Sequence, residues 1–248
     1  MAVDEALLES ATDGQCALRF YRWEEPTLSL GYFQEYADRQ RHPASEHCPV
    51  VRRTSGGGAI LHDIELTYSI AVPSSHPLAI NRLKFYQTVH AALIATLAQW
   101  GIEATMFVSP DRTLAEDTPS APLPRPADRQ PFLCFERRSP GDVLVGGVKV
   151  AGSAQRRCRG AVLQHGSVLL AQSAAAPELK GLKELTATTV TAEELIQGWL
   201  AKLAESLAIT WRSGGLSDRD LRRGIAMATE KHTSACWIKS RGRNDGIL

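Results

Sequence analysis

Hydrophobic and polar positions along the chain predict a mixture of strands and helices. Apolar and polar residues alternate from Leu66 to Val72, which is the period of a strand with one face in the core. From Asn81 to Trp100 apolar residues recur every three or four positions, which predicts a helix with one buried stripe that Gly101 ends. His90 lies in this helix, and we assign it no role, because such a histidine is commonly solvated or at the core edge. The same patterns predict a helix near residues 2–9 and strands over residues 17–23 and 27–32.

A glycine pair and two capping boxes predict a turn and two helix starts in the later part of the chain. Gly146-Gly147 separates two strand-like runs, residues 142–145 and 148–151, and supplies the positive φ values of a two-residue hairpin turn. Another strand is predicted over residues 161–170. The sequences Thr191 to Glu194 and Ser217 to Asp220 fit capping boxes at two helix starts. Together these elements predict an α+β fold with a mixed or antiparallel sheet and packed helices.

We expect a single domain over residues 1–248, because this length with 44% hydrophobic residues suffices for one sizeable core. Prolines crowd residues 109–131, so neither a helix nor a central strand can run through that segment. We interpret residues 109–131 as a proline-rich surface loop.

Charge and cysteine content narrow the classes of function. The net charge of +1 gives no global basic field, so no nucleic-acid partner is implied. No apolar run approaches the ~20 residues of a membrane span, and the amino terminus lacks a signal pattern, so we expect a cytoplasmic protein without a membrane partner. The cysteines are odd in number and scattered, without a C-x-x-C pair. Free thiols and no metal site are therefore expected.

A glycine-rich stretch, Arg52 to Asp63, is the first candidate for a ligand site. Three consecutive glycines remove every Cβ from one bend, so backbone amides can approach a ligand closely. Charged and titratable groups flank that bend on both sides. An ordinary turn is the alternative for the glycines, and surface ion pairs are the alternative for the arginines. The candidate residues of this stretch are Arg52, Arg53, Gly56, Gly57, Gly58 and His62.

A second stretch contains Cys134-Phe135-Glu136 and, fifteen residues after the cysteine, Lys149. Gly-x-Lys-x-x-Gly-Ser-Ala-Gln and Leu-Gln-His-Gly-Ser follow as motifs. Small residues on adjacent strands would leave a slot for an extended ligand, or would serve only close strand packing. The candidates here are Cys134, Lys149, Gly152, Ser153, Gln155, His165 and Gly166.

Taken together, the two stretches resemble the lipoate–protein ligase and octanoyltransferase family, whose members share the Arg-Arg, Gly-Gly, His-Asp loop and the Gly-x-Lys-x-x-Gly-Ser-Ala strand. The likeness spans most of the chain. Residues 1–9 resemble the family's opening helix. Lys231 to Trp237 resemble its closing Lys-aromatic-x-Ser-x-x-Trp segment, with His232 at the aromatic position. The resemblance implies a fold like that of the catalytic domain of biotin and lipoate protein ligases.

Cys134 indicates which branch of the family is nearer. The cysteine-dependent octanoyltransferases resemble this chain in Cys-Phe-Glu and in the spacing from Cys134 to Lys149, whereas ATP-dependent ligases do not need that cysteine. Gly58 points the other way, since a third glycine is typical of ligases. After Trp237 only about ten residues remain, far below the ~50 of an accessory ligase domain. Without the motif, an inert buried thiol would be the simpler reading of any one cysteine.

The resemblance implies transfer of an octanoyl or lipoyl group from an acyl-carrier protein to the lysine of a lipoyl domain or a glycine-cleavage H-type protein, without a cofactor. A thioester is already activated, so a thiolate can take the acyl group and pass it to an amine. A neighbouring ammonium, Lys149, would favour the thiolate form of Cys134. Two alternatives stay open, namely an ATP-dependent lipoate ligase and a non-catalytic acyl-carrier binding module.

Two spatial expectations follow. The stretches from Arg52 to Asp63 and from Lys149 to Gly166 each make half a site, so they should face one another across a shared acyl pocket. Basic residues around the second stretch would steer an acidic carrier protein, or form only a solvated face. These are Arg137, Arg138, Arg156, Arg157 and Arg159.

Overall fold

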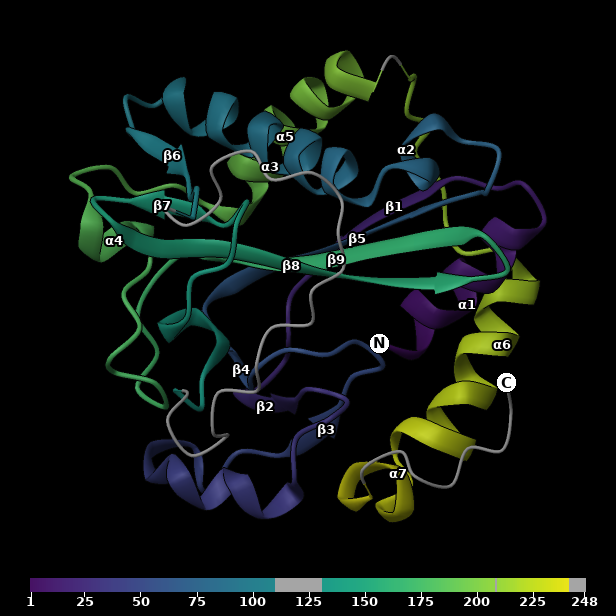
Figure 1. The fold of residues 1–248 in the computed structure, drawn as a ribbon, viewed down its shortest axis with the longest axis horizontal. Coiled ribbons are helices and arrows are strands. Elements are labelled where there is room, and N and C mark those ends of the chain that lie inside the picture. The colour runs from purple at the N-terminus through teal and green to yellow at the C-terminus, as the bar shows by residue number, and fades with distance from the viewer. Residues whose placement is uncertain (110–130, 208, 241–248) are drawn as a thin grey trace.

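The computed structural model describes residues 1–109, 131–207 and 209–240. An antiparallel six-stranded sheet, in the order β1-β5-β9-β8-β7-β6, crosses the middle of the molecule (Figure 1). Most of these strands were predicted, but the short strand β6 was not. The strands are β1 (Ala17–Tyr21), β5 (Glu65–Val72), β6 (Ala104–Met106), β7 (Val143–Val145), β8 (Val148–Cys158) and β9 (Ala161–Leu169).

A smaller sheet lies below the first in Figure 1. Its central strand pairs in parallel with one neighbour and antiparallel with the other. Its strands are β2 (Thr27–Leu30), β3 (Val50–Arg52) and β4 (Ile60–His62). The expected α+β class with mixed and antiparallel pairing is confirmed. The glycine bend, Gly56 to Gly58, lies in the connection from β3 to β4, beyond the ends of these two strands.

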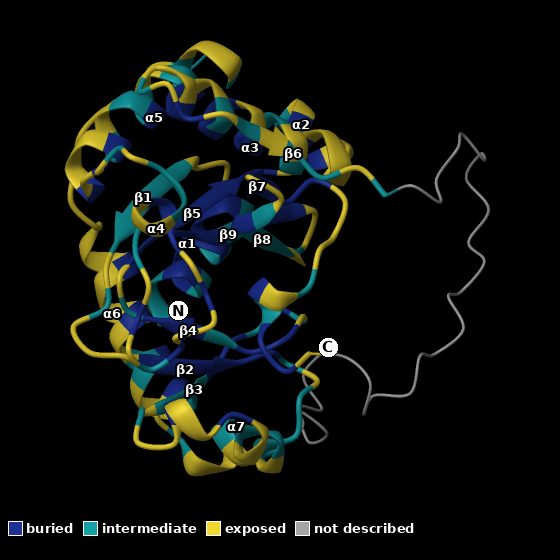
Figure 2. Cartoon of the chain, turned by 90° about the vertical axis from the view of Figure 1, so that its left-hand side faces the viewer, coloured by how far each residue is buried: buried dark blue, intermediate teal, exposed yellow. Residues whose placement is uncertain are grey.

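Helices cover both faces of the large sheet. On one face α3 and α5 pack over it, and Figure 2 shows their buried residues turned inward. On the other face α1 lies against β5 and β9, and α6 packs on α1. The helices are α1 (Ala2–Thr12), α2 (Pro77–Ile80), α3 (Arg82–Ala98), α4 (Leu182–Leu185), α5 (Ala192–Leu207), α6 (Asp218–Met227) and α7 (Ala235–Lys239).

The predicted turn and capping signals form as expected. Gly146 and Gly147 have φ of 56° and 78° between β7 and β8. The Glu194 carboxylate accepts a hydrogen bond from the Thr191 amide at 2.9 Å, and Thr191 Oγ1 accepts one from the Glu194 amide at 3.2 Å. These local signals therefore set the turn between β7 and β8 and the start of α5.

The prediction of one buried face for residues 66–72 is wrong, since every residue of β5 is buried. Thr67 and Ser69 are polar in sequence, yet their side of the sheet is also covered: α1 lies against Ser69, and the Trp23 indole donates to Thr67 at 3.1 Å. Their hydroxyls donate to buried carboxylates, Thr67 to Glu65 and Ser69 to Asp4. A buried hydroxyl that finds a carboxylate loses little stability, which is why this face tolerates polar residues.

The proline-rich segment predicted at 109–131 lies, except for its two end residues, outside the described residues. Within the described part of the chain, no helix is long and apolar enough to span a membrane.

Candidate active site

A cavity of about 380 Å³ lies where the two sheets meet, and both predicted stretches line it. The expectation that they share one pocket is therefore confirmed. All candidate residues except Arg52 and Gly58 border this cavity: Arg53, Gly56, Gly57, His62, Cys134, Lys149, Gly152, Ser153, Gln155, His165 and Gly166. Aromatic walls from Tyr21, Trp23, Tyr86 and Phe135 give it partly apolar surroundings, as an acyl chain requires.

Cys134 opens a single 3₁₀ turn, Cys134–Glu136, beside the glycine bend. Its amide donates to the Ala59 carbonyl at 2.7 Å, and the Ala59 amide donates to the Phe132 carbonyl at 2.9 Å. Because Ala59 directly follows the three glycines, these two bonds pin the cysteine to the end of the bend. A Cβ on Gly57 would lie 3.9 Å from Cys134 Sγ, so the bend closes directly over the thiol.

Lys149 brings its ammonium to the cysteine from strand β8. Its Nζ lies 3.9 Å from Cys134 Sγ and 3.3 Å from the Cys134 carbonyl oxygen. The same Nζ forms a 2.8 Å ion pair with Asp142, and both side chains are almost fully buried. A buried ammonium needs such a partner, because unpaired charge is costly away from water. The three acceptors around Nζ therefore hold it beside the thiol.

Gly152 makes room for that ion pair. A Cβ at this position would lie 2.6 Å from Lys149 Cε, 2.9 Å from its Nζ and 3.1 Å from Asp142 Oδ1. A Cβ at Gly166 would lie 2.4 Å from the Gly152 carbonyl oxygen on the neighbouring strand. Both glycines line the cavity, but packing already requires each of them: Gly152 leaves room for the ion pair, and Gly166 allows the close approach of β8 and β9.

Arg53 supports the glycine bend from beneath. Its guanidinium donates to the carbonyls of Ser29, Gly56 and Gly58 at 2.8, 3.0 and 2.5 Å. Burial lowers the pKa of Arg53 to about 10, so the side chain remains charged at neutral pH. It borders the cavity while its donors fix the backbone of the bend.

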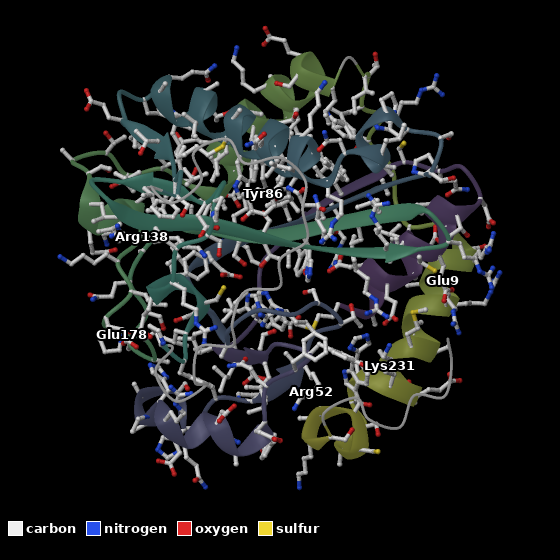
Figure 3. All side chains as sticks on the ribbon, in the orientation of Figure 1. Glu9, Arg52, Tyr86, Arg138, Glu178 and Lys231 are labelled. Atoms are coloured by element: carbon white, nitrogen blue, oxygen red, sulfur yellow. The ribbon has the colours of Figure 1, made fainter. Side chains whose placement is uncertain are left out.

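Arg52, a ligand-binding candidate in the sequence, instead forms hydrogen bonds to main-chain carbonyls. Its side chain is fully buried and lies outside the cavity lining. Its guanidinium donates to carbonyls of Gly31, Gln34 and Ile238, and its own carbonyl accepts from the Trp237 indole at 2.9 Å. Arg52 thus fastens α7 to the small sheet (Figure 3).

Gly58 also stays outside the cavity lining. A Cβ there would lie 3.0 Å from the Phe132 carbonyl oxygen and 3.1 Å from the Cys134 amide. The third glycine therefore lets the cysteine segment approach the bend, which is a packing role and not a direct ligand contact.

Two histidines lie at the cavity. His62 stacks on Trp23 with ring centroids 4.3 Å apart, and its Nδ1 contacts the buried Glu65 carboxylate. His165 Nε2 lies 2.7 Å from Ser55 Oγ, which joins β9 to the start of the glycine bend. Burial lowers the pKa of His165 to about 4, so this ring is neutral near pH 7.

Sequence reasoning missed Asp142, Tyr86 and His90, which surround Lys149 and Ser153. His90, which was assigned no role, is fully buried, and its Nε2 lies 2.6 Å from Ser153 Oγ. A signal was present in the sequence, because Tyr86, His90 and Leu93 are spaced by four and three on the buried stripe of α3.

Gln155 lies at the cavity edge, where its amide donates to Gln164 at 2.8 Å.

The arginines predicted to form one basic cluster are spread over the molecule. Arg156 donates to the Thr54 carbonyl beside the glycine bend, whereas Arg157 donates to Ala79 of α2. Arg137 is half-buried against the Pro131 carbonyl, and Arg138 is exposed. Arg138 and Arg156 directly adjoin the cavity-lining residues Ser139 and Gln155 in sequence, so they are the best placed of these five arginines to meet a partner.

The sequence matches the family model of the lipoyl protein ligase A/B catalytic domain over residues 1–185. A protein of Geobacillus kaustophilus named octanoyltransferase LipM is 32% identical, and the match covers 96% of this chain and 92% of the relative. A protein of the same name from Bacillus anthracis is also 32% identical, with coverage of 96% and 92%.

Solved structures resemble the chain in fold. A putative lipoate protein ligase from T. acidophilum with bound lipoic acid has a TM-score of 0.73 and 21% identity, and covers 96% of this chain and 91% of its own. A lipoate-protein ligase A bound with ATP has a TM-score of 0.71, 20% identity, and coverage of 96% and 92%. At these identities the likeness concerns the fold alone.

Proposed function

The chain belongs to the family of the lipoyl protein ligase A/B catalytic domain and is an octanoyltransferase, and from that premise we propose that Cys134 carries the octanoyl group between donor and acceptor. The observation that supports this most directly is the 3.9 Å distance between Lys149 Nζ and Cys134 Sγ inside the shared cavity. An ammonium at this distance places positive charge beside the sulfur, which is the atom that attacks the donor thioester.

The first half-reaction forms the acyl-enzyme. The Cys134 thiolate attacks the carbonyl carbon of an octanoyl thioester, the bond from that carbon to the donor sulfur breaks, and the donor leaves as a thiolate that takes up a proton. Lys149 stabilises the thiolate before the attack and contributes positive charge beside the developing oxyanion. The octanoyl chain lies along the cavity walls near Trp23 and Phe135.

The second half-reaction transfers the chain to the lysine of a lipoyl domain. The acceptor's neutral amine attacks the Cys134 thioester, the carbon–sulfur bond breaks, and an amide forms. The amine gives one proton to solvent water, which balances the proton that the donor thiolate took up in the first half-reaction, and the departing cysteine leaves as a thiolate beside Lys149. The backbone of Lys149 pairs with Leu144 of β7, so a rigid strand carries its side chain throughout.

An acyl-carrier protein is the proposed donor. Its thioester is already activated, so no nucleotide is needed, and the fold neighbours that bind ATP are ligases of low sequence identity. The arginines next to cavity-lining residues, Arg138 and Arg156, would meet an acidic carrier surface.

The test compares two donors in transfer to a purified lipoyl domain: octanoyl-carrier protein without nucleotide, and free octanoate with ATP and magnesium. We expect rapid octanoylation with the carrier thioester alone. Octanoylation that requires ATP and free acid would identify a ligase, and binding of the carrier without any transfer would identify a non-catalytic module.

A further inference from the structure

Asp142 is the carboxylate that orients Lys149, and its own orientation is fixed by three donors. Oδ2 accepts from Lys149 Nζ at 2.8 Å and from the Ser139 amide at 2.7 Å, while Oδ1 accepts from the Tyr86 hydroxyl at 2.9 Å. The Asp142 side chain is 1% exposed, so water does not compete for these oxygens. Any group that fixes Asp142 therefore also fixes the ammonium beside Cys134.

The Tyr86 hydroxyl connects this carboxylate to the strand that carries the lysine. It accepts a hydrogen bond from the Ser153 amide at 3.0 Å, four residues after Lys149 on β8, and donates to Asp142. These directions follow from chemistry, since an amide N–H only donates and a carboxylate only accepts. Tyr86 lies between α3 and the large sheet (Figure 3), so one hydroxyl ties helix, strand and carboxylate together.

His90, one helical turn after Tyr86, fixes the backbone next to Asp142. Its Nδ1 lies 2.6 Å from the carbonyl oxygen of Gly141, which only accepts, so Nδ1 carries the proton. Nε2 then accepts from Ser153 Oγ at 2.6 Å, and Ser153 Oγ in turn accepts from the Tyr68 hydroxyl at 2.5 Å. Burial lowers the pKa of His90 to about 4, which keeps this neutral tautomer near pH 7.

We propose that Tyr86 and His90 are positioning residues for octanoyl transfer: from one face of α3 they hold Asp142, and through Asp142 they hold the Lys149 ammonium at the Cys134 thiol. Tyr86 acts on the carboxylate, and His90 acts on the peptide that precedes it. Neither residue exchanges bonds with the substrate in this scheme. The inference rests on the roles proposed above for Cys134 and Lys149.

Tyr86→Phe tests the hydroxyl while keeping the ring. Asp142 loses one donor, and its charge then attracts Lys149 more strongly and away from the thiol. We expect kcat for octanoyl transfer to fall about tenfold with KM changed by less than about twofold, because a small misplacement of a catalytic group mainly affects the reaction step. Tyr36→Phe is the matched control, since its hydroxyl accepts from Arg39 at 2.9 Å outside the cavity lining.

A second readout needs no substrate and separates positioning from general damage to the fold. The rate at which iodoacetamide alkylates Cys134 is measured against pH by peptide mass, with exposed Cys16 as the internal reference. We expect Tyr86→Phe to move the Cys134 profile to higher pH and to leave the Cys16 rate unchanged. An unchanged Cys134 profile overturns the proposal even if transfer slows, and an unchanged kcat overturns it as well. Failure of wild-type Cys134 to form an acyl-enzyme would instead overturn the proposed function.

His90 is tested by a pair of variants. In His90→Asn the side-chain amide can still donate to the Gly141 carbonyl, as Nδ1 does, whereas His90→Leu removes both hydrogen bonds. We expect transfer to fall at least about tenfold in His90→Leu and most of that loss to be recovered in His90→Asn. If thermal unfolding shows that both variants are folded and their activities are equal, the proposed role of His90 is overturned. If His90→Leu does not fold, His90→Asn is compared with wild type in the alkylation profile, where a large shift contradicts the proposal.

Discussion

The Lys149 ammonium interacts with two partners at once, and it lies closer to the carboxylate than to the thiol. Its ion pair with Asp142 is 2.8 Å long, while Cys134 Sγ is 3.9 Å away. When Cys134 is acylated it carries no charge, and the Asp142 carboxylate then remains the ion-pair partner of the Lys149 ammonium. The lysine therefore need not move during the reaction. A site that is already arranged before the substrate arrives loses little energy to reorganisation.

Gly152→Ala is a sensitive probe of that geometry. The added methyl group would overlap Lys149 Cε and press against Nζ and Asp142, so the ammonium must shift. We expect kcat to fall about 100-fold, since displacement by about 1 Å can cost that much. The matched control is Gly214→Ala, where a Cβ meets nothing within 4 Å. Steady-state kinetics check this, and a Gly152→Ala enzyme as fast as the control would show that the position of Lys149 is not critical.

At the scale of elements, the buried Arg52 ties the small sheet to α7. Arg52 joins β3, the loop after β2 and α7 through donors to several main-chain carbonyls. No local sequence pattern could reveal this, because the partner carbonyls of Trp237 and Ile238 lie at the far end of the chain.

Arg52→Lys should lower the free energy of unfolding by about 2–4 kcal/mol, because one ammonium cannot replace a planar guanidinium and leaves buried carbonyls without donors. Urea unfolding monitored by circular dichroism measures the loss. Arg212→Lys, at an exposed position, is the control. If both variants are as stable as wild type, the hydrogen bonds of Arg52 to main-chain carbonyls do not contribute to stability as expected.

Sequence patterns predicted the elements whose signals are local. The Gly146-Gly147 turn, the capped helices and the two motif stretches all formed where expected. The second covered face of β5 was not predictable in the same way, because its polar residues are buried by residues distant in sequence, Ser69 by Asp4 of α1 and Thr67 by Trp23. His90 was predictable in principle from its spacing to Tyr86, but a histidine on a helix has too many ordinary roles for the pattern alone to decide.

The same limit applies at the site. Cys134 and Lys149 could be named because their motif is contiguous. Asp142 could not, since it opposes Lys149 only through the irregular register between β7 and β8. The placement of Arg53 under the glycine bend and of Arg52 outside it also depends on the turn itself, and adjacent arginines in sequence gave no means to tell them apart.

For the whole molecule, two buried histidines make stability depend on pH. Burial lowers the pKa of His90 and of His165 from 6.5 to about 4, so the unfolded chain binds more protons than the folded one between these values. Stability is therefore fully present above about pH 6.5 and is lost as the pH falls toward 4, by up to about 1.4 kcal/mol per pH unit for each histidine.

Urea midpoints measured from pH 7 to pH 4 test this expectation. Asp4 and Glu5, whose pKa values fall to about 2 because of ionic and hydrogen-bonding partners that outweigh burial, extend the loss below pH 4. A flat midpoint between pH 6.5 and pH 4.5 would mean that neither histidine is held neutral by the fold.

Recognition of an acidic carrier is also a property of the whole surface. Reversing Arg138 and Arg156 to glutamate should lower kcat/KM about threefold to tenfold at low salt and flatten its dependence on ionic strength, because steering acts on encounter. Arg212→Glu is the control for added negative charge at an exposed position. Equal kinetics of the double variant and the control at low salt would remove these arginines from the docking surface.

Intact-protein mass measured after mixing with octanoyl-carrier protein shows directly whether Cys134 carries the octanoyl group as a thioester. Wild-type protein and Cys16→Ser should each gain one octanoyl group that neutral hydroxylamine removes. Cys134→Ser should gain none and should transfer at least about a thousandfold more slowly, because an alcohol without a strong base lacks the nucleophilicity of a thiolate. Near-normal, ATP-dependent octanoylation by Cys134→Ser, with no adduct on the wild-type protein, would contradict the account and identify a ligase.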